Sequence, residues 1–183
     1  MKRATMTLVL AMLLVSLAAL FVAGDACDNI PSMRREDACF KACTNDAHLY
    51  NLCRQVLQGS PESAEVTAYA LTAARLATWS YDATVARASQ LVANGVPHDE
   101  RDAYLRCINR YAVARGEAAD VMAGIARCEF GRAEQEYVAA VAGVETCGDL
   151  LAAFKSSPVV AMNAADHDLT MVAYDLGALF IGK

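Results

Sequence analysis

The sequence predicts an all-α protein: an up-down-up-down four-helix bundle with an N-terminal α-hairpin extension, stapled by disulfides. The first observation is that apolar residues recur at alternating steps of three and four along four long segments, which is the spacing of one helix face. The second is that seven cysteines accompany a secretory type of N-terminus, where disulfides can form. No segment alternates apolar and polar residues for long enough to be a strand.

Residues 1–24 are expected to be a signal peptide. Lys2 and Arg3 precede an uncharged apolar run over 8–23 that ends in small residues. The alternative is a membrane anchor, but the run is short for a membrane span and no cluster of charges follows it. The mature chain, 25–183, would then be secreted and would have no membrane attachment.

The mature chain is expected to be one acidic domain, with a hairpin over 25–59 and the bundle over 60–183. The full sequence has a formal net charge of −5, and loss of Lys2 and Arg3 with the signal peptide makes it −7. Such a chain is a poor candidate for binding nucleic acid and a better one for binding a basic protein partner.

The hairpin should contain two short helices joined by a disulfide. Ser32 can cap the first helix, which carries Cys39 and Cys43, and the second spans 49–57 and carries Cys53. Neither helix is long enough to be stable alone, so a covalent link between them is expected. Cys39 and Cys43 lie four residues apart and face the same way, so either could reach Cys53.

The first bundle helix should begin at Ser60-Pro61-Glu62, which combines a capping serine with a proline at the first helical position. It should continue to Asn94, before Gly95. Its core-facing residues are expected to be Leu71, Ala74, Thr78, Tyr81, Val85, Ala88 and Val92. Trp79 lies off this stripe, and we expect it to cover the side of the bundle, under the N-terminal hairpin. The alternative is that Trp79 is an anchor for a protein partner.

The second and third bundle helices each place one cysteine among their core positions. The second should span 99–127, and the third should end before Ser156-Ser157-Pro158, because a residue that precedes proline disfavours the α conformation. The two stripes are Tyr104, Cys107, Tyr111, Ala114, Ala118, Val121 and Ile125, and Ala133, Tyr137, Ala140, Val144, Cys147, Leu151 and Phe154. Two antiparallel helices packed on these faces would bring Cys107 and Cys147 together, so a disulfide is predicted between them.

The fourth bundle helix should follow Pro158. Its core-facing residues are expected to be Met162, Ala165, Leu169, Val172, Leu176 and Leu179. Asp166 and Asp168 are expected in an early turn, where the helix dipole favours acidic side chains.

The sequence lacks the motifs of an enzyme. It contains no nucleophile elbow, no zinc-protease helix, no phosphate-binding glycine loop and no dinucleotide fingerprint, and its three histidines are scattered. Cys39, Cys43, His48 and Cys53 have the ligand types of a zinc site, but secretion favours disulfides. We therefore expect no catalytic residues, no metal and no cofactor, and interpret the chain as a secreted interaction domain.

Three local motifs resemble the plant invertase and pectin methylesterase inhibitor family. They are Leu49-Tyr50-Asn51-Leu52-Cys53, Leu105-Arg106-Cys107 followed by Tyr111, and the run of small residues over 139–145 that ends in Thr146-Cys147. The resemblance covers the chain from about Ala38 to the end. It implies a signal peptide, an N-terminal hairpin closed by cysteines and a four-helix bundle, in an inhibitor secreted to the plant cell wall (the apoplast).

The resemblance also implies two disulfides, one within the hairpin and one between the second and third bundle helices. The family's spacing favours Cys43 as the partner of Cys53, with Cys39 or Cys27 as alternates. Cys128 lies in a connection rather than on a helix stripe, and the other six cysteines can pair among themselves. We therefore predict that Cys128 is the free thiol.

The family contains two activities, inhibition of invertase and inhibition of pectin methylesterase. The resemblance ties each activity to different residues. Invertase inhibitors carry a Pro-Lys-Phe turn between the second and third bundle helices, where this chain has Cys128, Glu129 and Phe130. A glutamate would face the carboxylates of a glycosidase and repel them. Thr146, beside Glu145, matches a threonine of the pectin methylesterase inhibitors. The resemblance thus favours an inhibitor of pectin methylesterase that acts by stoichiometric complex formation.

Three alternatives stay open at this stage. Within the family they are an inhibitor of acid invertase and an interaction protein that has lost both activities. Outside it, a secreted helical lipid-binding protein would also be rich in cysteine, although the adjacent cysteines of plant lipid-transfer proteins are absent.

Overall fold

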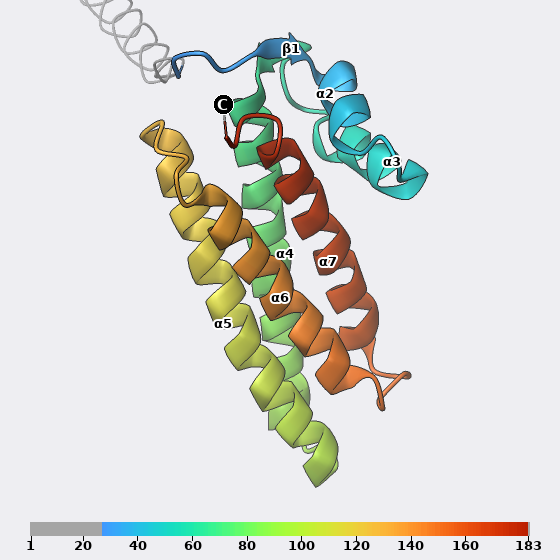
Figure 1. The fold of residues 1–183 in the computed structure, drawn as a ribbon. Coiled ribbons are helices and arrows are strands. Elements are labelled where there is room, and N and C mark those ends of the chain that lie inside the picture. The colour runs from blue at the N-terminus through green and yellow to red at the C-terminus, as the bar shows by residue number, and fades with distance from the viewer. Residues whose placement is uncertain (1–26, 183) are drawn as a thin grey trace, which may run out of the picture.

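A computed structural model describes residues 27–182 of the chain, so the predicted signal peptide lies outside the described residues. Four long helices form the antiparallel bundle that the sequence predicts, and two short helices form the N-terminal hairpin (Figure 1). The elements are β1 (Ser32–Arg34), α2 (Arg35–Ala42), α3 (Ala47–Val56), β2 (Ser63–Glu65), α4 (Val66–Ala93), α5 (His98–Ala126), α6 (Ala133–Leu151) and α7 (Pro158–Gly177).

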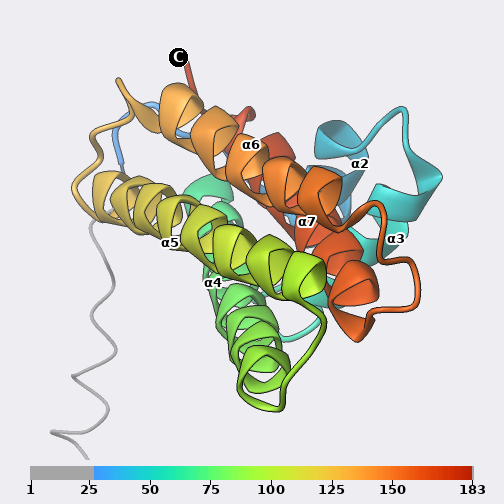
Figure 2. The same cartoon turned by 90° about the horizontal axis from the view of Figure 1, so that it is seen from below.

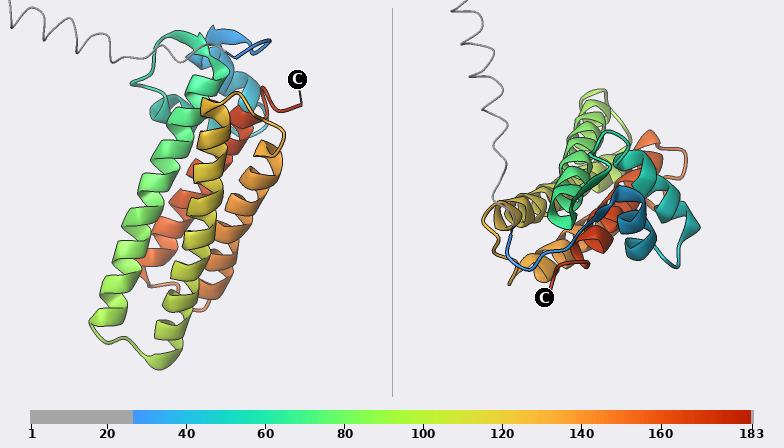
Figure 3. Two further views of the ribbon diagram at one scale, coloured as in Figure 1. Left: turned by 90° about the vertical axis from the view of Figure 1, so that its left-hand side faces the viewer. Right: turned by 90° about the horizontal axis from the view of Figure 1, so that it is seen from above.

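The bundle is square in cross-section. Helix α4 packs against α5 and α7, and α6 packs against the same two helices, so that α4 and α6 lie at opposite corners (Figure 2). The hairpin covers one end of the bundle, where α2 and α3 contact α7 (Figure 3). The short connections fix this order, because each can join only neighbouring antiparallel helices.

Two predicted helix starts are wrong, because a short antiparallel ladder includes the first position and lies between the second position and the helix that follows it. Ser32 pairs with Glu65 in the β1–β2 ladder, so it does not cap a helix, and α2 begins only at Arg35. Ser60-Pro61-Glu62 lies before β2, and α4 begins at Val66. The Tyr69 hydroxyl lies within hydrogen-bonding distance of the carbonyls of Met33 and Pro61, so the first turns of α4 hold the ladder in place.

The predicted Cys107–Cys147 disulfide is confirmed, and it joins α5 to α6. The hairpin disulfide joins Cys53 to Cys39, so the prediction of Cys43 as its partner is wrong. Cys43 terminates α2 as its C-cap residue, and its sulfur lies 3.9 Å from a carboxylate oxygen of Asp175 on α7. The side chain one turn earlier, at Cys39, is therefore the one that faces α3.

The prediction that Cys128 is the free thiol is also wrong. Cys128 forms a disulfide with Cys27, and this bond ties the first described residue to the connection between α5 and α6. Cys43 is instead the unpaired cysteine of the described residues, and it is buried. An extended N-terminal segment can reach across the end of the bundle, which is why the sequence pattern of the helices gave no indication of this pair.

The core-facing stripes of α5 and α6 are buried as predicted, apart from half-buried Phe154. The stripes of α4 and α7 are only partly correct. In α7, Ala165 is exposed, whereas Asn163, Asp166 and Thr170 are buried. Asp166 lies eight residues after Pro158, so its predicted position in an early turn is also wrong. Some of the core-facing residues of α7 were predicted wrongly because polar side chains were expected to face solvent.

Candidate functional site

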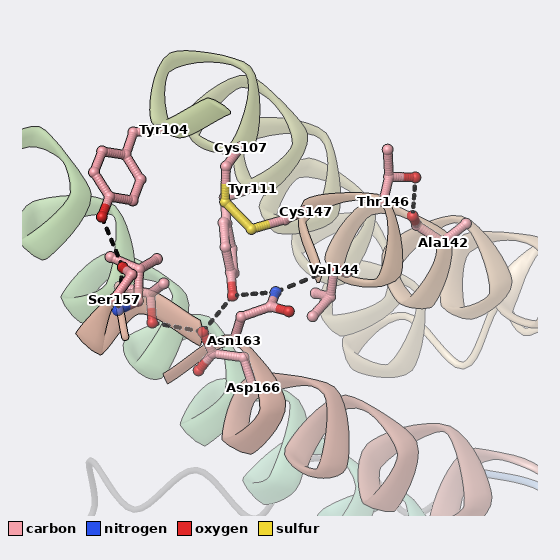
Figure 4. Close-up of a disulfide and its surroundings, with 12 residues drawn as sticks. Tyr104, Cys107, Tyr111, Ala142, Val144, Thr146, Cys147, Ser157, Asn163 and Asp166 are labelled. Atoms are coloured by element: carbon pink, nitrogen blue, oxygen red, sulfur yellow. Dashed lines mark hydrogen bonds between the residues drawn. A yellow bond between two sulfur atoms is a disulfide. The ribbon is translucent and has the colours of Figure 1, made fainter. Parts of the chain in front are cut away.

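A cluster of buried polar side chains lies inside the bundle, close to the Cys107–Cys147 disulfide (Figure 4). Its centre is Asp166 of α7, whose side chain is fully buried. The Thr84 hydroxyl of α4 and the Tyr111 hydroxyl of α5 each donate a hydrogen bond to Asp166 Oδ2 at 2.6 Å. The Ser80 hydroxyl donates to the other carboxylate oxygen. Three hydroxyl groups from two helices therefore satisfy a carboxylate that is removed from water.

Asn163 extends this network to the fourth helix. Its Nδ2 donates to Tyr111 Oη at 3.0 Å and to the backbone carbonyl of Val144 on α6 at 2.9 Å. An alanine Cβ at Gly148 would lie 2.8 Å from Asn163 Oδ1, so the missing side chain of α6 provides the space for the amide. The network thus links all four bundle helices at one level.

The electrostatics of the network favour a structural role. Burial raises the pKa of Asp166, although hydrogen bonds from Ser80, Thr84 and Tyr111 oppose that shift. Burial and the charge of Asp166 raise the pKa of Tyr111, which therefore stays protonated and acts as a donor. The network connects all four bundle helices, so it can hold them in alignment.

The four predicted partner-binding residues lie at two separate places. Glu129 and Phe130 are in the connection that precedes α6, whereas Glu145 and Thr146 are in the second half of that helix. Sixteen residues separate Phe130 from Thr146, which corresponds to about 24 Å along a helix. The structure therefore divides these residues into a turn and a helix face.

The Glu129–Phe130 turn is held in place on several sides. The neighbouring Cys128 is bonded to Cys27, and the Glu129 backbone N–H donates to the Gly124 carbonyl at 2.9 Å. The Glu129 carboxylate is exposed and accepts from Arg127 Nε at 2.8 Å. The Phe130 ring is half-buried against Phe180, with 4.8 Å between the ring centroids. Phe130 is therefore part of the packing at this end of the bundle.

Thr146 and Glu145 face different neighbours of α6. Thr146 is half-buried, and its hydroxyl donates to the Ala142 carbonyl of its own helix at 2.6 Å (Figure 4). Glu145 is exposed, and its Oε1 lies 3.3 Å from His167 Nε2 of α7. The two residues therefore flank the outer face of α6, with Glu145 on the side of α7.

Glu145 also begins a line of ionisable groups that crosses three helices. His167 Nδ1 lies 3.6 Å from Asp168 Oδ1, and the other oxygen of Asp168 lies 2.8 Å from His48 Nε2 of α3. This line connects α6 through α7 to the hairpin. The four residues come from three helices, and the sequence did not indicate that they meet.

Helices α5 and α6 pack closely together, and each exposes one valine to solvent. An alanine Cβ at Gly143 of α6 would lie 3.1 Å from the Cβ of Ala114 and 3.1 Å from the Arg110 carbonyl, so the two helices approach each other closely. Val113 of α5 and Val138 of α6 are 48% and 52% exposed. Exposed apolar side chains over closely packed helices suit contact with another protein. In the sequence, Val113 and Val138 are recognisable only as apolar residues that lie outside the predicted core stripes.

The chain matches the family model described as plant invertase/pectin methylesterase inhibitor over residues 36–176. The match spans the hairpin and nearly all of the bundle. The chain belongs to this family. No curated protein was found to match the chain.

Solved structures of the inhibitor family share the fold. A mutant form of a pectin methylesterase inhibitor from Arabidopsis superposes with a TM-score of 0.68 at 20% identity, covering 80% of this chain and 97% of that one. A pectin methylesterase inhibitor from Arabidopsis thaliana gives a TM-score of 0.62 at 18% identity, covering 82% and 99% of the two chains. At this identity the likeness establishes the fold alone.

The family consists of inhibitors rather than enzymes, and the chain is an inhibitor-family protein. Within residues 27–182, no group of three or more His, Cys, Asp or Glu side chains is arranged to hold a metal ion. In the same part of the chain, no helix is both long enough and apolar enough to cross a membrane.

The prediction for Trp79 is wrong, because the hairpin lies elsewhere. Trp79 stands on the outer face of α4 and is 70% exposed. The hairpin packs mainly against α7, at the end of the bundle, and leaves the middle of α4 uncovered (Figure 3). The alternative of a partner contact at Trp79 therefore gains support.

Proposed function

We propose that this protein inhibits a plant pectin methylesterase by forming a stoichiometric complex with it in the cell wall. The observation that carries the proposal is the outer side of the closely packed helices α5 and α6, where Val113 and Val138 are exposed. Family membership supports an enzyme as the protein partner. Secretion to the apoplast follows from the predicted signal peptide and agrees with the family.

The architecture of the face suits a broad contact rather than insertion of a single side chain. The close approach of α5 and α6 at Gly143 brings the two helices together, so a second protein can contact both of them at once. Exposed valines lose little side-chain entropy on binding, because branched side chains are already restricted in χ1. The face can therefore contribute apolar burial at low entropic cost.

The experiment that tests this location measures inhibition by variants of the face. Val113→Arg and Val138→Arg place a long charged side chain in the proposed contact, and we expect inhibition to weaken by roughly 10-fold or more. Ala164→Arg, at an exposed position of α7, is the matched control and should inhibit like the wild type. Equal inhibition by all three variants would place the contact elsewhere.

Inhibition of acid invertase is the second candidate. The observation in its favour is the fixed turn at Glu129, which is exposed and is anchored by the Cys27–Cys128 disulfide. The packing of Phe130 against Phe180 and the negative charge of Glu129 count against it. The variant Glu129→Lys supplies the positive charge of the invertase-type turn. If the turn selects the target, this variant should gain activity against invertase, and its inhibition of pectin methylesterase should not change.

A further inference from the structure

The outer face of α4 carries an aromatic side chain with no partner among the described residues. Trp79 is the only tryptophan of the chain and is 70% exposed. Four neighbouring positions on the same side of the helix are also exposed, one turn before it (Arg75), one turn after it (Asp82 and Ala83) and two turns after it (Ala86). We call these five residues the Trp79 face. No described helix lies beyond α4 on the side away from α6 (Figure 2).

The charges of the Trp79 face are arranged antisymmetrically about the indole. Arg75 lies four residues before Trp79, or about 6 Å along the axis, and Asp82 lies three residues after it, or about 4.5 Å. Arg75 makes no salt bridge with another described residue. One Asp82 oxygen lies 3.2 Å from Arg115 Nε of α5, which leaves its second oxygen available. A positive group on one side and a negative group on the other form a self-complementary pattern.

We propose that the protein forms a two-fold symmetric dimer through the Trp79 face. In an antiparallel pair of α4 helices centred on Trp79, Arg75 of each copy lies within about 2 Å, along the axis, of Asp82 of the other. The two indoles pack together over the small side chains of Ala83 and Ala86, which allow the helices to approach closely. Each dimer then contains two Arg75–Asp82 pairs and one central aromatic contact.

The pattern favours a second copy over an unrelated partner. Two-fold symmetry pairs a residue before the centre with one after it, and the Trp79 face has opposite charges at those two places. A carbohydrate or an unrelated protein would require no such antisymmetry. The contact involves one helix from each copy and lies at the small end of interface sizes, below about 1,200 Å² in total. The dimer should therefore be weak and dependent on concentration.

The dimer is independent of the proposed inhibitory surface. Helix α6 lies at the opposite corner of the bundle from α4, so it stays on the outside of each copy. Self-association and inhibition can accordingly be measured separately. Failure of one proposal would leave the other intact.

The first test follows the mature protein by sedimentation equilibrium and by Trp79 fluorescence. Over concentrations from about 1 μM to about 1 mM, the range of weak affinities, we expect a monomer–dimer equilibrium and a blue shift of the emission as the indole leaves water. Trp79→Gln should weaken dimerisation by about 30-fold or more, which is typical of a central aromatic anchor. A non-reducing gel excludes a covalent dimer formed through Cys43. A monomer throughout this range would overturn the proposal.

The second test uses charge reversal and mixing. Arg75→Glu alone and Asp82→Arg alone should each be monomeric, because each homodimer would contain two pairs of like charges. An equimolar mixture of the two variants should form a heterodimer, since both of its pairs are then of opposite charge. The Asp82–Arg115 pair is exposed and contributes little to the fold, so both variants should stay folded. Arg101→Glu, an exposed site on α5, is the control and should dimerise like the wild type.

Mixing the Arg75→Glu and Asp82→Arg variants shows whether the Trp79 face binds a second copy of the chain or a different partner. Heterodimer formation supports the antiparallel pairing of two copies. Failure of the two variants to associate, or a dimer that persists in Trp79→Gln, would overturn it. Monomers that bind another wall component through Trp79 would show that the face has a different partner.

Discussion

Tyr111 on α5 donates a 2.6 Å hydrogen bond to Asp166 on α7, across the interior of the bundle. The same hydroxyl accepts a bond from Asn163, which in turn reaches the backbone of α6. By contrast, Tyr137 buries its hydroxyl without any hydrogen-bond partner. Two buried tyrosines of one core therefore differ in whether the hydroxyl makes a hydrogen bond.

We expect Tyr111→Phe to lower the free energy of unfolding by about 1–3 kcal/mol, because it removes one donor to Asp166 and the acceptor of Asn163. The matched control is Tyr137→Phe, which removes a buried hydroxyl that lacks a partner and should be neutral or stabilising. Urea unfolding of the two variants measures the difference. Equal destabilisation by both would mean that the network contributes nothing beyond packing.

Asp166 should make stability dependent on pH. Burial raises the pKa of Asp166 in the folded protein above its value in the unfolded chain. Between the two values the folded state binds more protons, so the free energy of unfolding falls as the pH rises from about 4 through the raised pKa. Asp166→Asn should flatten this part of the profile, measured by urea unfolding at a series of pH values. Asp175, whose pKa burial also raises, stays unchanged in the comparison. A variant profile parallel to that of the wild type would contradict the role of Asp166.

Cys43 should be the only cysteine that reacts with an alkylating agent, and it should react slowly. Burial, together with the charge of Asp175, raises the pKa of the Cys43 thiol to about 12, so the reactive thiolate is scarce at neutral pH. Iodoacetamide should leave the native protein unlabelled and should label Cys43 after denaturation without reductant. Peptide mapping by mass spectrometry identifies the site. Labelling of Cys128 instead would refute the Cys27–Cys128 bond.

The Cys27–Cys128 disulfide should make a large contribution to stability. Its residues are 101 apart in the sequence, and the loop-entropy estimate for such a loop is about 4.7 kcal/mol. We expect the double variant Cys27→Ser/Cys128→Ser to unfold at a much lower urea concentration and to retain its helical spectrum. Cys43→Ser, which breaks no disulfide, is the control. A double variant as stable as that control would show that the bond does not constrain the unfolded chain.

The bundle could be predicted from the sequence because apolar residues recur with the helical period, most regularly in α5 and α6. The stripes through Cys107 and Cys147 are buried as expected, and their disulfide follows from that geometry. The stripe of α7 could not be found in the same way. Asp166 faces inward because Tyr111 and two hydroxyls of α4 donate to it, Asn163 bonds to Tyr111, and Thr170 pairs with the hydroxyl of Tyr81. Pairing between distant side chains leaves no trace in the periodicity of one helix.

The candidate surfaces were only partly predictable. Glu145, Thr146, Glu129 and Phe130 were chosen by resemblance, and the structure separates them into a helix face and a packed turn. The line from Glu145 through His167 and Asp168 to His48 depends on how the hairpin docks on α7. The burial of Phe130 and the pairing of Cys27 with Cys128 likewise depend on tertiary contacts. Local patterns describe one helix at a time, and these features join several.

The most direct measurement is a titration of plant pectin methylesterase and of acid invertase with the mature, disulfide-intact protein. The proposed function predicts that pectin methylesterase activity falls in proportion to added inhibitor and is lost near one equivalent, while invertase activity is nearly unchanged. Size-exclusion chromatography of the mixture should show a complex with pectin methylesterase. Loss of invertase activity with pectin methylesterase unaffected would contradict the assignment and reverse the choice of target.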